Sequence, residues 1–191
     1  MLHAFGCSFT YGTSCINPST DSWPVLLGQM LNTDCKNYGI SGASNDYIFK
    51  TLSENLDSFS SKDIIIIMMT KPSRRYFRNN NVLPNSNNEL SRIYYKYIND
   101  QKGDCINFLQ NLNAFHYILK DYRYLITFID ARTLLECNEY KLGAVARQKQ
   151  NVYIPKKLSF DRYIEGVDNL HPSNKGHKQI AQELFERNFN E

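Results

Sequence analysis

The 191-residue sequence has no long hydrophobic run. Its longest apolar stretch, Ile64–Met69, is far shorter than the roughly 20 residues that span a bilayer, so the sequence predicts no membrane helix. The first residues carry neither a basic segment nor a long apolar one, so we identify no signal peptide and expect a cytoplasmic protein.

The sequence also lacks paired cysteines and a strong charge of one sign. Its five cysteines (Cys7, Cys15, Cys35, Cys105 and Cys137) form no Cys-x-x-Cys pair and no zinc-ligand spacing, which predicts reduced thiols and no bound metal. The net charge of +3, from 22 basic and 19 acidic residues, is too small to predict nucleic-acid binding.

Hydrophobic residues make up 42% of the chain and charged residues 21%, which is typical of one soluble globular domain over residues 1–191. Short apolar runs predict strands at residues 2–6, 36–40, 63–69 and 124–130. Amphipathic segments predict helices at residues 21–31, 46–56, 89–97, 105–120 and 173–189. This alternation predicts an α/β fold, with helices on both faces of a parallel sheet.

Residues 71–88 are polar and rich in asparagine, and we expect a long mobile loop inserted there. The loop starts with four basic residues: Lys71, Arg74, Arg75 and Arg78. Because they follow the third strand, they either form a solvated surface or recognise an anionic substrate at the carboxyl edge of the sheet.

Two segments could carry chemistry. Ser8 follows the first strand and Gly6, where its hydroxyl could be presented at the sheet edge, although an ordinary turn serine would have the same pattern. Asp168 lies three residues before His171, just ahead of the last helix. The carboxylate could fix the imidazole tautomer so that His171 acts as a general base, or the segment could simply cap the helix.

Taken together, these segments resemble the SGNH (GDSL-type) hydrolase superfamily. Residues 37–45, which include Gly42, look like the family's second block, and residues 171–177 look like its last block. The matching segments extend from residue 5 to residue 177. The resemblance implies a flavodoxin-like three-layer α/β/α sandwich with about five parallel strands.

The resemblance also implies the roles of individual residues. Ser8 would be the nucleophile, His171 the general base and Asp168 the residue that orients it. The N–H groups of Ser8 and Gly42, together with Thr70, would form the oxyanion hole. No metal or organic cofactor is implied.

Two positions depart from the family pattern. Cys7 replaces the usual Asp before the serine, and Thr70 takes the position of an oxyanion Asn, which makes the chain resemble divergent, phage-like members that a virus could encode. Either the Thr70 hydroxyl donates a hydrogen bond to the oxyanion, or Asn45 or Arg74 donates one in its place, or activity is low. Losing one oxyanion donor costs about 10²–10³ in rate. Cys7 is a rival nucleophile, but adjacent residues on an extended turn point in different directions, which favours Ser8.

These observations predict a serine esterase that acts on a small polar ester, for example by deacetylating a carbohydrate, with Asn45, Arg74 and Arg75 as possible substrate-binding residues. The alternative is a weakly active or inactive module of the same fold that binds an anionic ligand or a protein partner. We expect a small-molecule or glycan ester as the partner, with no membrane or nucleic acid; the oligomeric state is left open. Trp23 is expected to lie in the core, and His177 is expected to pack locally in the last helix rather than to act in catalysis.

Overall fold

The computed structural model describes residues 1–84, 86–139, 151–155, 159–163 and 170–189. Four strands form one parallel sheet in the order β2 (Cys35–Asn37), β1 (Leu2–Phe5), β3 (Ile64–Met69) and β6 (Arg123–Phe128). In this order the chain moves to one side of β1 and then to the other, as in doubly wound flavodoxin-like sheets.

The position of a fifth strand, beside β6, is occupied by a single parallel bridge between Ile126 and Val152. The Ile126 N–H donates to the Asn151 carbonyl and the Tyr153 N–H donates to the Ile126 carbonyl, both at 2.8 Å. Where the resemblance implied about five parallel strands, the described part of the parallel sheet therefore has four strands and one parallel bridge at its β6 edge.

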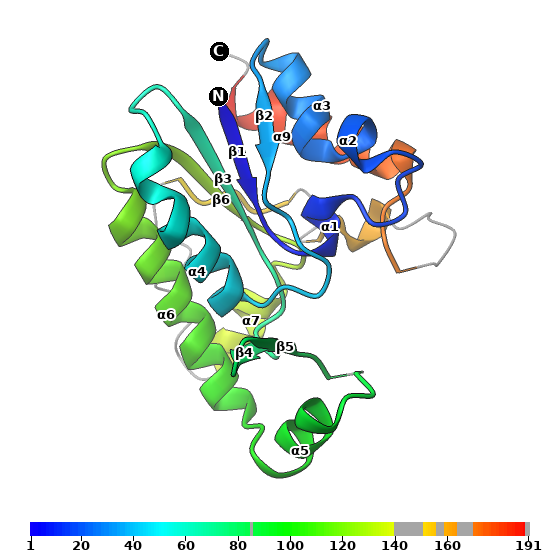
Figure 1. Ribbon diagram of the computed structural model, residues 1–191, viewed down its shortest axis with the longest axis vertical. Coiled ribbons are helices and arrows are strands. Elements are labelled where there is room, and N and C mark those ends of the chain that lie inside the picture. The colour runs from blue at the N-terminus through cyan, green and yellow to red at the C-terminus, as the bar shows by residue number, and fades with distance from the viewer. Residues whose placement is uncertain (85, 140–150, 156–158, 164–169, 190–191) are drawn as a thin grey trace.

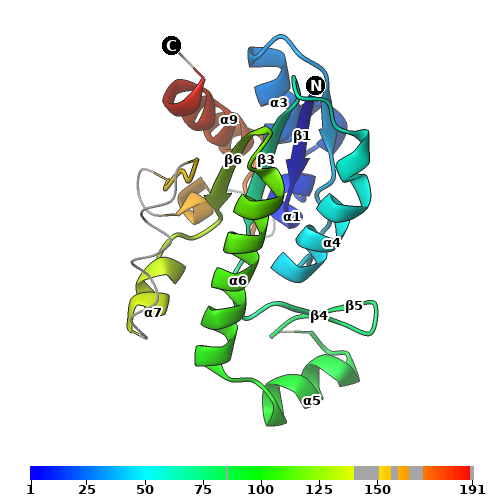
Figure 2. The same ribbon diagram turned by 90° about the vertical axis from the view of Figure 1, so that its left-hand side faces the viewer.

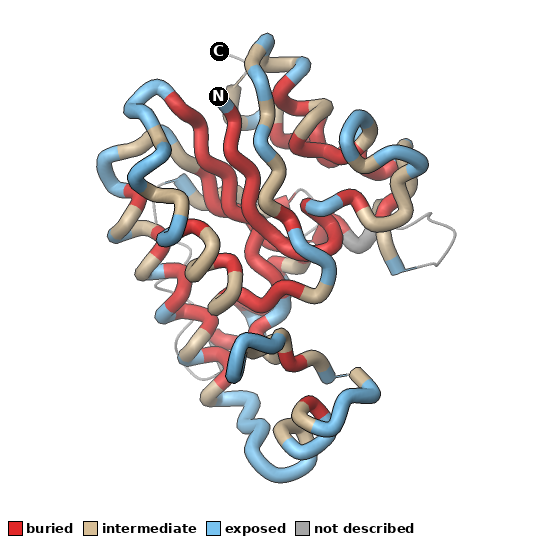
Figure 3. Tube along the Cα trace, viewed as in Figure 1, coloured by how far each residue is buried: buried red, intermediate tan, exposed pale blue. Residues whose placement is uncertain are grey.

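Helices cover both faces of the sheet (Figures 1 and 2). The helices α3 (Trp23–Met30) and α9 (Asn174–Asn188) pack together on one face, and α4 (Asn45–Asn55) and α6 (Gln101–Leu119) pack on the other. All six residues of β3 are buried, as expected for a central strand in such a sheet (Figure 3). The predicted three-layer sandwich is confirmed.

Several shorter elements lie around this frame. They are α1 (Ser8–Tyr11), α2 (Pro18–Asp21), η1 (Leu56–Ser58), α5 (Glu89–Tyr97), α7 (Thr133–Glu139) and η2 (Phe160–Tyr163). Among the described helices, none is long and apolar enough to cross a membrane.

Residues 71–88 differ from the expected polar loop, because they contain an antiparallel hairpin of β4 (Arg75–Phe77) and β5 (Asn80–Val82). Arg78 and Asn79 connect the strands, and both have positive φ, 47° and 61°. Two central residues with positive φ are typical of a type I′ turn, for which Asn-Gly or Asp-Gly is the usual sequence signal. The sequence lacks that signal, which is why the hairpin was missed.

Candidate active site

Ser8 is the first residue of α1, directly after the turn that ends β1. Gly6 permits this turn, because a Cβ there would lie 2.0 Å from the Thr10 Oγ1 and 3.1 Å from the Met68 carbonyl oxygen. The Ser8 Oγ lies 3.7 Å from the fully buried Cys7 Sγ. The Ser8 N–H, one of the free donors at a helix start, finds no acceptor among the described residues.

Gly42 occupies the third position of a tight turn between β2 and α4. Its φ is +80°, and the Ala43 N–H donates to the Ile40 carbonyl at 3.0 Å, a pattern typical of a type II turn, which favours glycine at this position. Within the described part of the chain, the Gly42 N–H has no acceptor. The next residue but one, Ser44, then caps α4 by accepting a hydrogen bond from the Tyr47 N–H at 3.2 Å.

Thr70 follows β3 and is tied to Asn45 at the start of α4. The Asn45 Nδ2 donates to the Thr70 carbonyl at 3.1 Å, and the Thr70 N–H donates to the Asn45 Oδ1 at 2.9 Å. Both residues are buried. The Thr70 Oγ1 is buried without a hydrogen-bond partner among the described residues. Asn45 thus holds the main chain of Thr70, and its side-chain amide is engaged in doing so.

His171 reaches the same region from the other end of the chain. Its ring centroid lies 5.9 Å from that of Phe9, the residue after Ser8. Asp168, the predicted orienting carboxylate, lies outside the described residues. The structure therefore brings together the predicted nucleophile and base segments, while the role of Asp168 stays a prediction.

His177 joins the last helix to α3. It is fully buried, and its Nδ1 accepts a hydrogen bond from the Trp23 N–H at the start of α3, at 3.1 Å. Burial, and secondarily the neighbouring His171, lower the pKa of His177 to about 4. Ser22 stands at the N-cap position of α3 and makes no side-chain cap hydrogen bond, and His177 accepts from the first N–H of that helix.

Asn174, which the sequence analysis did not single out, binds the start of the last helix to the segment between α1 and α3. Its Oδ1 accepts from the Ile16 N–H at 3.0 Å, and its Nδ2 donates to the Asp21 Oδ2 at 2.9 Å. These partners lie just beyond α1 and in α2. Only its place in the last motif block could have pointed to this residue.

Of the basic residues described after β3, Arg75 lies beside carboxylates and Arg74 does not share them. Arg75 faces two carboxylates, with its Nη1 3.8 Å from Asp104 and its Nε 3.9 Å from Asp46. Burial raises the pKa of Asp104 to about 6, and Arg75 opposes that rise. The Arg74 Nη1 is buried without a partner among the described residues. Arg75 thus contributes to internal ion pairs, and recognition of an anionic substrate stays a prediction.

No protein-family model matches the sequence, and no curated protein matches it. Solved structures do match over nearly the whole chain. A member of the lipolytic G-D-S-L family from Veillonella parvula is 15% identical, with 100% of this chain and 98% of that chain covered and a TM-score of 0.59. A psychrotrophic esterase from Pseudoalteromonas, solved inhibited by monoethylphosphonate, is 12% identical, with 97% and 94% covered and a TM-score of 0.60.

A third similar structure is a family 3 carbohydrate esterase from Clostridium thermocellum, which is 12% identical, with 97% and 92% covered and a TM-score of 0.53. At such low identity the similarity concerns the fold. The chain therefore has the fold of the G-D-S-L lipolytic proteins, which confirms at this level the SGNH resemblance of its sequence.

Proposed function

We propose that this protein is a serine-dependent carboxyl-ester hydrolase. The observation that carries the proposal is the contact between the two ends of the chain, where Phe9 beside Ser8 meets the ring of His171. A serine hydroxyl and an imidazole that accepts its proton are the minimal pair for nucleophilic acyl transfer, and this contact brings the segments that carry them together.

In the proposed reaction, the Ser8 Oγ attacks the ester carbonyl carbon while His171 takes the hydroxyl proton. The tetrahedral intermediate collapses when His171 returns that proton to the leaving alcohol, which leaves an acyl group on Ser8. A water molecule, deprotonated by His171, then attacks the acyl carbon and releases the acid and free Ser8. Asp168 orients the imidazole in this scheme.

Three unsatisfied donors support an oxyanion hole. The N–H groups of Ser8 and Gly42 and the hydroxyl of Thr70 have no partner among the described residues. Ser8 and Thr70 are buried, whereas Gly42 is half-buried. Buried polar groups are nearly always hydrogen-bonded, so the free donors of Ser8 and Thr70 call for a reason, and a substrate oxyanion would supply one. Thr70 takes the place of the family's Asn and would donate through its shorter side chain.

The substrate that we propose is a small polar ester, with an O-acetylated carbohydrate as one candidate. Its support is indirect: the fold is shared with carbohydrate esterases, although a fold does not fix a substrate.

Hydrolysis of p-nitrophenyl acetate and butyrate tests the proposal directly. We expect activity in the wild type and a loss of at least 10³-fold in Ser8→Ala and His171→Ala. The matched controls are Ser53→Ala, on the exposed side of α4, and His116→Ala, whose imidazole contacts Tyr124. A fluorophosphonate probe should label the wild type at Ser8 and leave Ser8→Ala unlabelled. Retained hydrolysis in Ser8→Ala with loss in Cys7→Ala would assign the nucleophile to Cys7 instead.

The second candidate is a binding module of the same fold with little turnover. The replacement of the oxyanion Asn by Thr70 is the observation that favours it. A folded wild type that neither hydrolyses esters nor reacts with the fluorophosphonate would select this alternative.

A further inference from the structure

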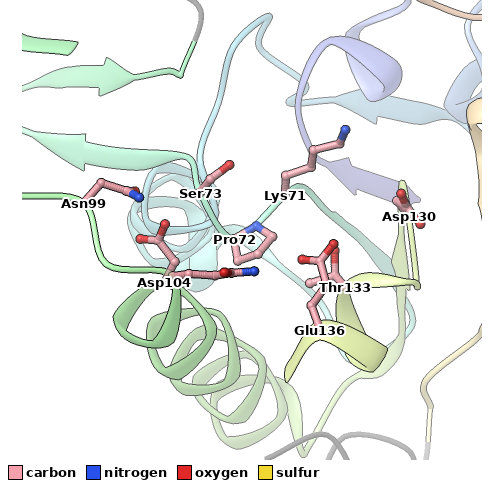
Figure 4. A pocket seen from close by; sticks show the side chains of 9 residues that line it. Lys71, Pro72, Ser73, Asn99, Asp104, Asp130, Thr133 and Glu136 are labelled. Atoms are coloured by element: carbon pink, nitrogen blue, oxygen red, sulfur yellow. The ribbon is translucent and has the colours of Figure 1, made fainter. Parts of the chain in front are cut away.

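The hairpin and α5 form an extension that leaves the sandwich after β3 and returns to it at the start of α6. The two ends of the extension join the sandwich side by side, because Lys71, Pro72, Ser73 and Asn99 line one pocket of about 360 Å³ (Figure 4). From there the extension reaches outward, and α5 lies at the end of the molecule farthest from the N-terminus (Figures 1 and 2).

One face of α5 holds the extension together. The Ser91 Oγ accepts a hydrogen bond from the Leu83 N–H at 3.2 Å, and Ser91 is buried. The Tyr95 hydroxyl donates to the carbonyl of Ser73, in the segment after β3. This face of the helix therefore has its partners within the extension itself.

The opposite face of α5 is exposed. Five side chains of this face line one groove of about 270 Å³: Glu89, Arg92, Ile93, Lys96 and Tyr97. The Ile93 side chain is 44% exposed and the Tyr97 side chain 71%, and Lys96 lies 4.9 Å over the Tyr97 ring. None of the three charged groups forms an ion pair within the described ranges. Apolar side chains and unpaired charges that share an exposed helix face indicate a contact surface.

The charges of this face complement those of a second copy of the same face. Glu89 lies four residues before Ile93, and Lys96 three residues after it, so all three share one side of the helix. When two α5 helices pack antiparallel about a two-fold axis at Ile93, Glu89 of each copy lies opposite Lys96 of the other. Arg92 and Tyr97 flank this row on opposite sides, so the axis brings Arg92 of one copy to the side of Tyr97 of the other, as a cation–π contact requires.

Other occupants match this face less well. An acidic peptide or a nucleic acid would pair with Arg92 and Lys96 but would bring a like charge to Glu89. A bilayer surface binds helices that have a broad apolar face, whereas here charged side chains surround Ile93 and Tyr97.

We propose that α5 is a dimerisation surface, on which two copies of this chain pack antiparallel with Ile93 at the two-fold axis and Glu89 paired with Lys96. A helix of nine residues offers less than the roughly 800 Å² per partner of a standard interface, so we expect a reversible dimer with a Kd on the order of 10–100 µM. None of the proposed site residues takes part in this contact, so it is independent of the proposed esterase function.

Charge reversal combined with sedimentation equilibrium tests the pairing. Lys96→Glu brings two carboxylates together on each side of the axis, and Glu89→Lys brings two ammonium groups together, so each variant should weaken the dimer at least about tenfold. An equimolar mixture of the two variants should associate within about threefold of the wild type, because both positions then hold opposite charges. Lys120→Glu is the matched control, since Lys120 is also exposed, at a helix C-terminus and over a tyrosine ring.

Ile93→Glu tests the apolar centre of the contact. Because Ile93 is exposed in the monomer, this variant should keep the far-UV circular dichroism of the wild type and lose the dimer. In the wild type, the amides of α5 should exchange at least about fivefold more slowly at about 500 µM protein than at about 5 µM, because association stabilises the paired helix. In Ile93→Glu the exchange should be equal at both concentrations.

Four outcomes would overturn the inference. The first is a wild type that stays monomeric at about 1 mM. The second is a dimer that neither the charge reversals nor Ile93→Glu weakens, which would place the interface elsewhere. The third is a mixture of the two charge variants that stays monomeric, which would reject the antiparallel pairing. The fourth is a monomer that binds phosphatidylglycerol vesicles through Ile93, which would assign the face to a lipid surface.

Discussion

The hydroxyl of Thr70 is the side-chain donor in the proposed oxyanion hole. The main chain of Thr70 is fixed by two hydrogen bonds to Asn45. Its Oγ1, by contrast, is buried and has no partner among the described residues. A buried hydroxyl without a partner is costly to the folded state, which suggests a function that compensates for that cost.

Thr70→Val separates the catalytic from the structural contribution of this hydroxyl. We expect kcat for p-nitrophenyl acetate to fall about 10²-fold, since one oxyanion donor is lost, while the melting temperature stays equal or rises, since a buried hydroxyl without a partner is removed. Thr51→Val, which removes a hydroxyl bound to the Tyr47 carbonyl on α4, should leave kcat unchanged. Unchanged kcat in Thr70→Val would remove Thr70 from the oxyanion hole.

His177 predicts a pH-dependent stability. Its folded pKa of about 4 lies below the ordinary value of 6.5, so the unfolded chain takes up a proton between these pH values that the folded chain does not. Stability is therefore full above pH 6.5 and is lost as the pH falls to 4, by at most about 3 kcal/mol. Asp104, whose pKa is raised to about 6, acts in the opposite sense.

The comparison of wild type with His177→Gln isolates this contribution. Urea unfolding at a series of pH values between 7 and 4 should show a steeper loss of stability in the wild type than in the variant, because only the wild type carries this group. Since Asp104 is present in both proteins, its effect cancels in the difference. Parallel pH profiles would contradict the assignment.

At the residue scale, short motifs in the sequence located segments that the fold brings together, while the catalytic roles of Ser8, Gly42 and His171 stay predictions. The structure places Ser8 at the start of α1, Gly42 in the tight turn before α4, and His171 beside Phe9. The bond from His177 to the Trp23 N–H and the bonds from Asn45 to Thr70 were not predictable, because both join residues that only the folded chain brings together.

The hairpin of β4 and β5 is the element that most distinguishes the structure from the sequence expectation. It contacts the loop of the proposed oxyanion hole: the Asn81 Oδ1 accepts from the Ser44 N–H at 3.0 Å, and the Leu83 Cδ1 lies 3.2 Å from the place where a Cβ on Gly42 would be. The Tyr76 N–H in turn donates to the Asp46 Oδ2 at 3.2 Å. The hairpin therefore braces the turn that presents Gly42.

Asn81→Ala should loosen that turn. Removing the acceptor of the buried Ser44 N–H costs about 1–3 kcal/mol, and we expect kcat for p-nitrophenyl acetate to fall about tenfold with little change in KM. Asn81→Asp keeps an acceptor oxygen and should restore most of kcat. Asn80→Ala is the control, because among the described residues the Asn80 Nδ2 donates only to the Arg78 carbonyl. Equal activity in all three variants would show that the hairpin does not position the turn.

Elements with a clear periodicity were predicted well. The helix expected at residues 89–97 coincides with α5, and the one expected at 46–56 differs from α4 by a single residue at each end. The hairpin was not predicted, since Arg78 and Asn79 adopt positive φ without a glycine. The strand expected at 36–40 is shorter in the structure, although the N–H groups of Tyr38 and Ile40 still donate to carbonyls of the β1 segment.

On the scale of the whole molecule, the hairpin and α5 form an extension at one end of the sandwich (Figures 2 and 3). The strands at the centre are buried, whereas Ile93, Tyr97 and Ile98, in and just after α5, are exposed. Burial of apolar contacts determines how readily a segment opens. The α5 segment therefore has the smaller barrier to local unfolding.

Hydrogen exchange measures this difference. Amides of β1 and β3 should exchange only by global unfolding, whereas amides of α5 should exchange at least 10²-fold faster by local opening. Addition of urea should accelerate exchange in the strands strongly and in α5 weakly, because local opening exposes less surface. Equal protection in both regions would show that the extension folds as one unit with the sandwich.

The fluorescence of Trp23, whose main-chain N–H binds His177, reports on the position of the last helix. Trp23 is the only tryptophan in the sequence, is fully buried, and lies where α9 meets α3. Its emission should shift to longer wavelength when α9 leaves that position and water reaches the indole. Because His171 lies just ahead of α9, fluorescence would follow the separation of the proposed base from the nucleophile, and loss of esterase activity in denaturant should coincide with that spectral change.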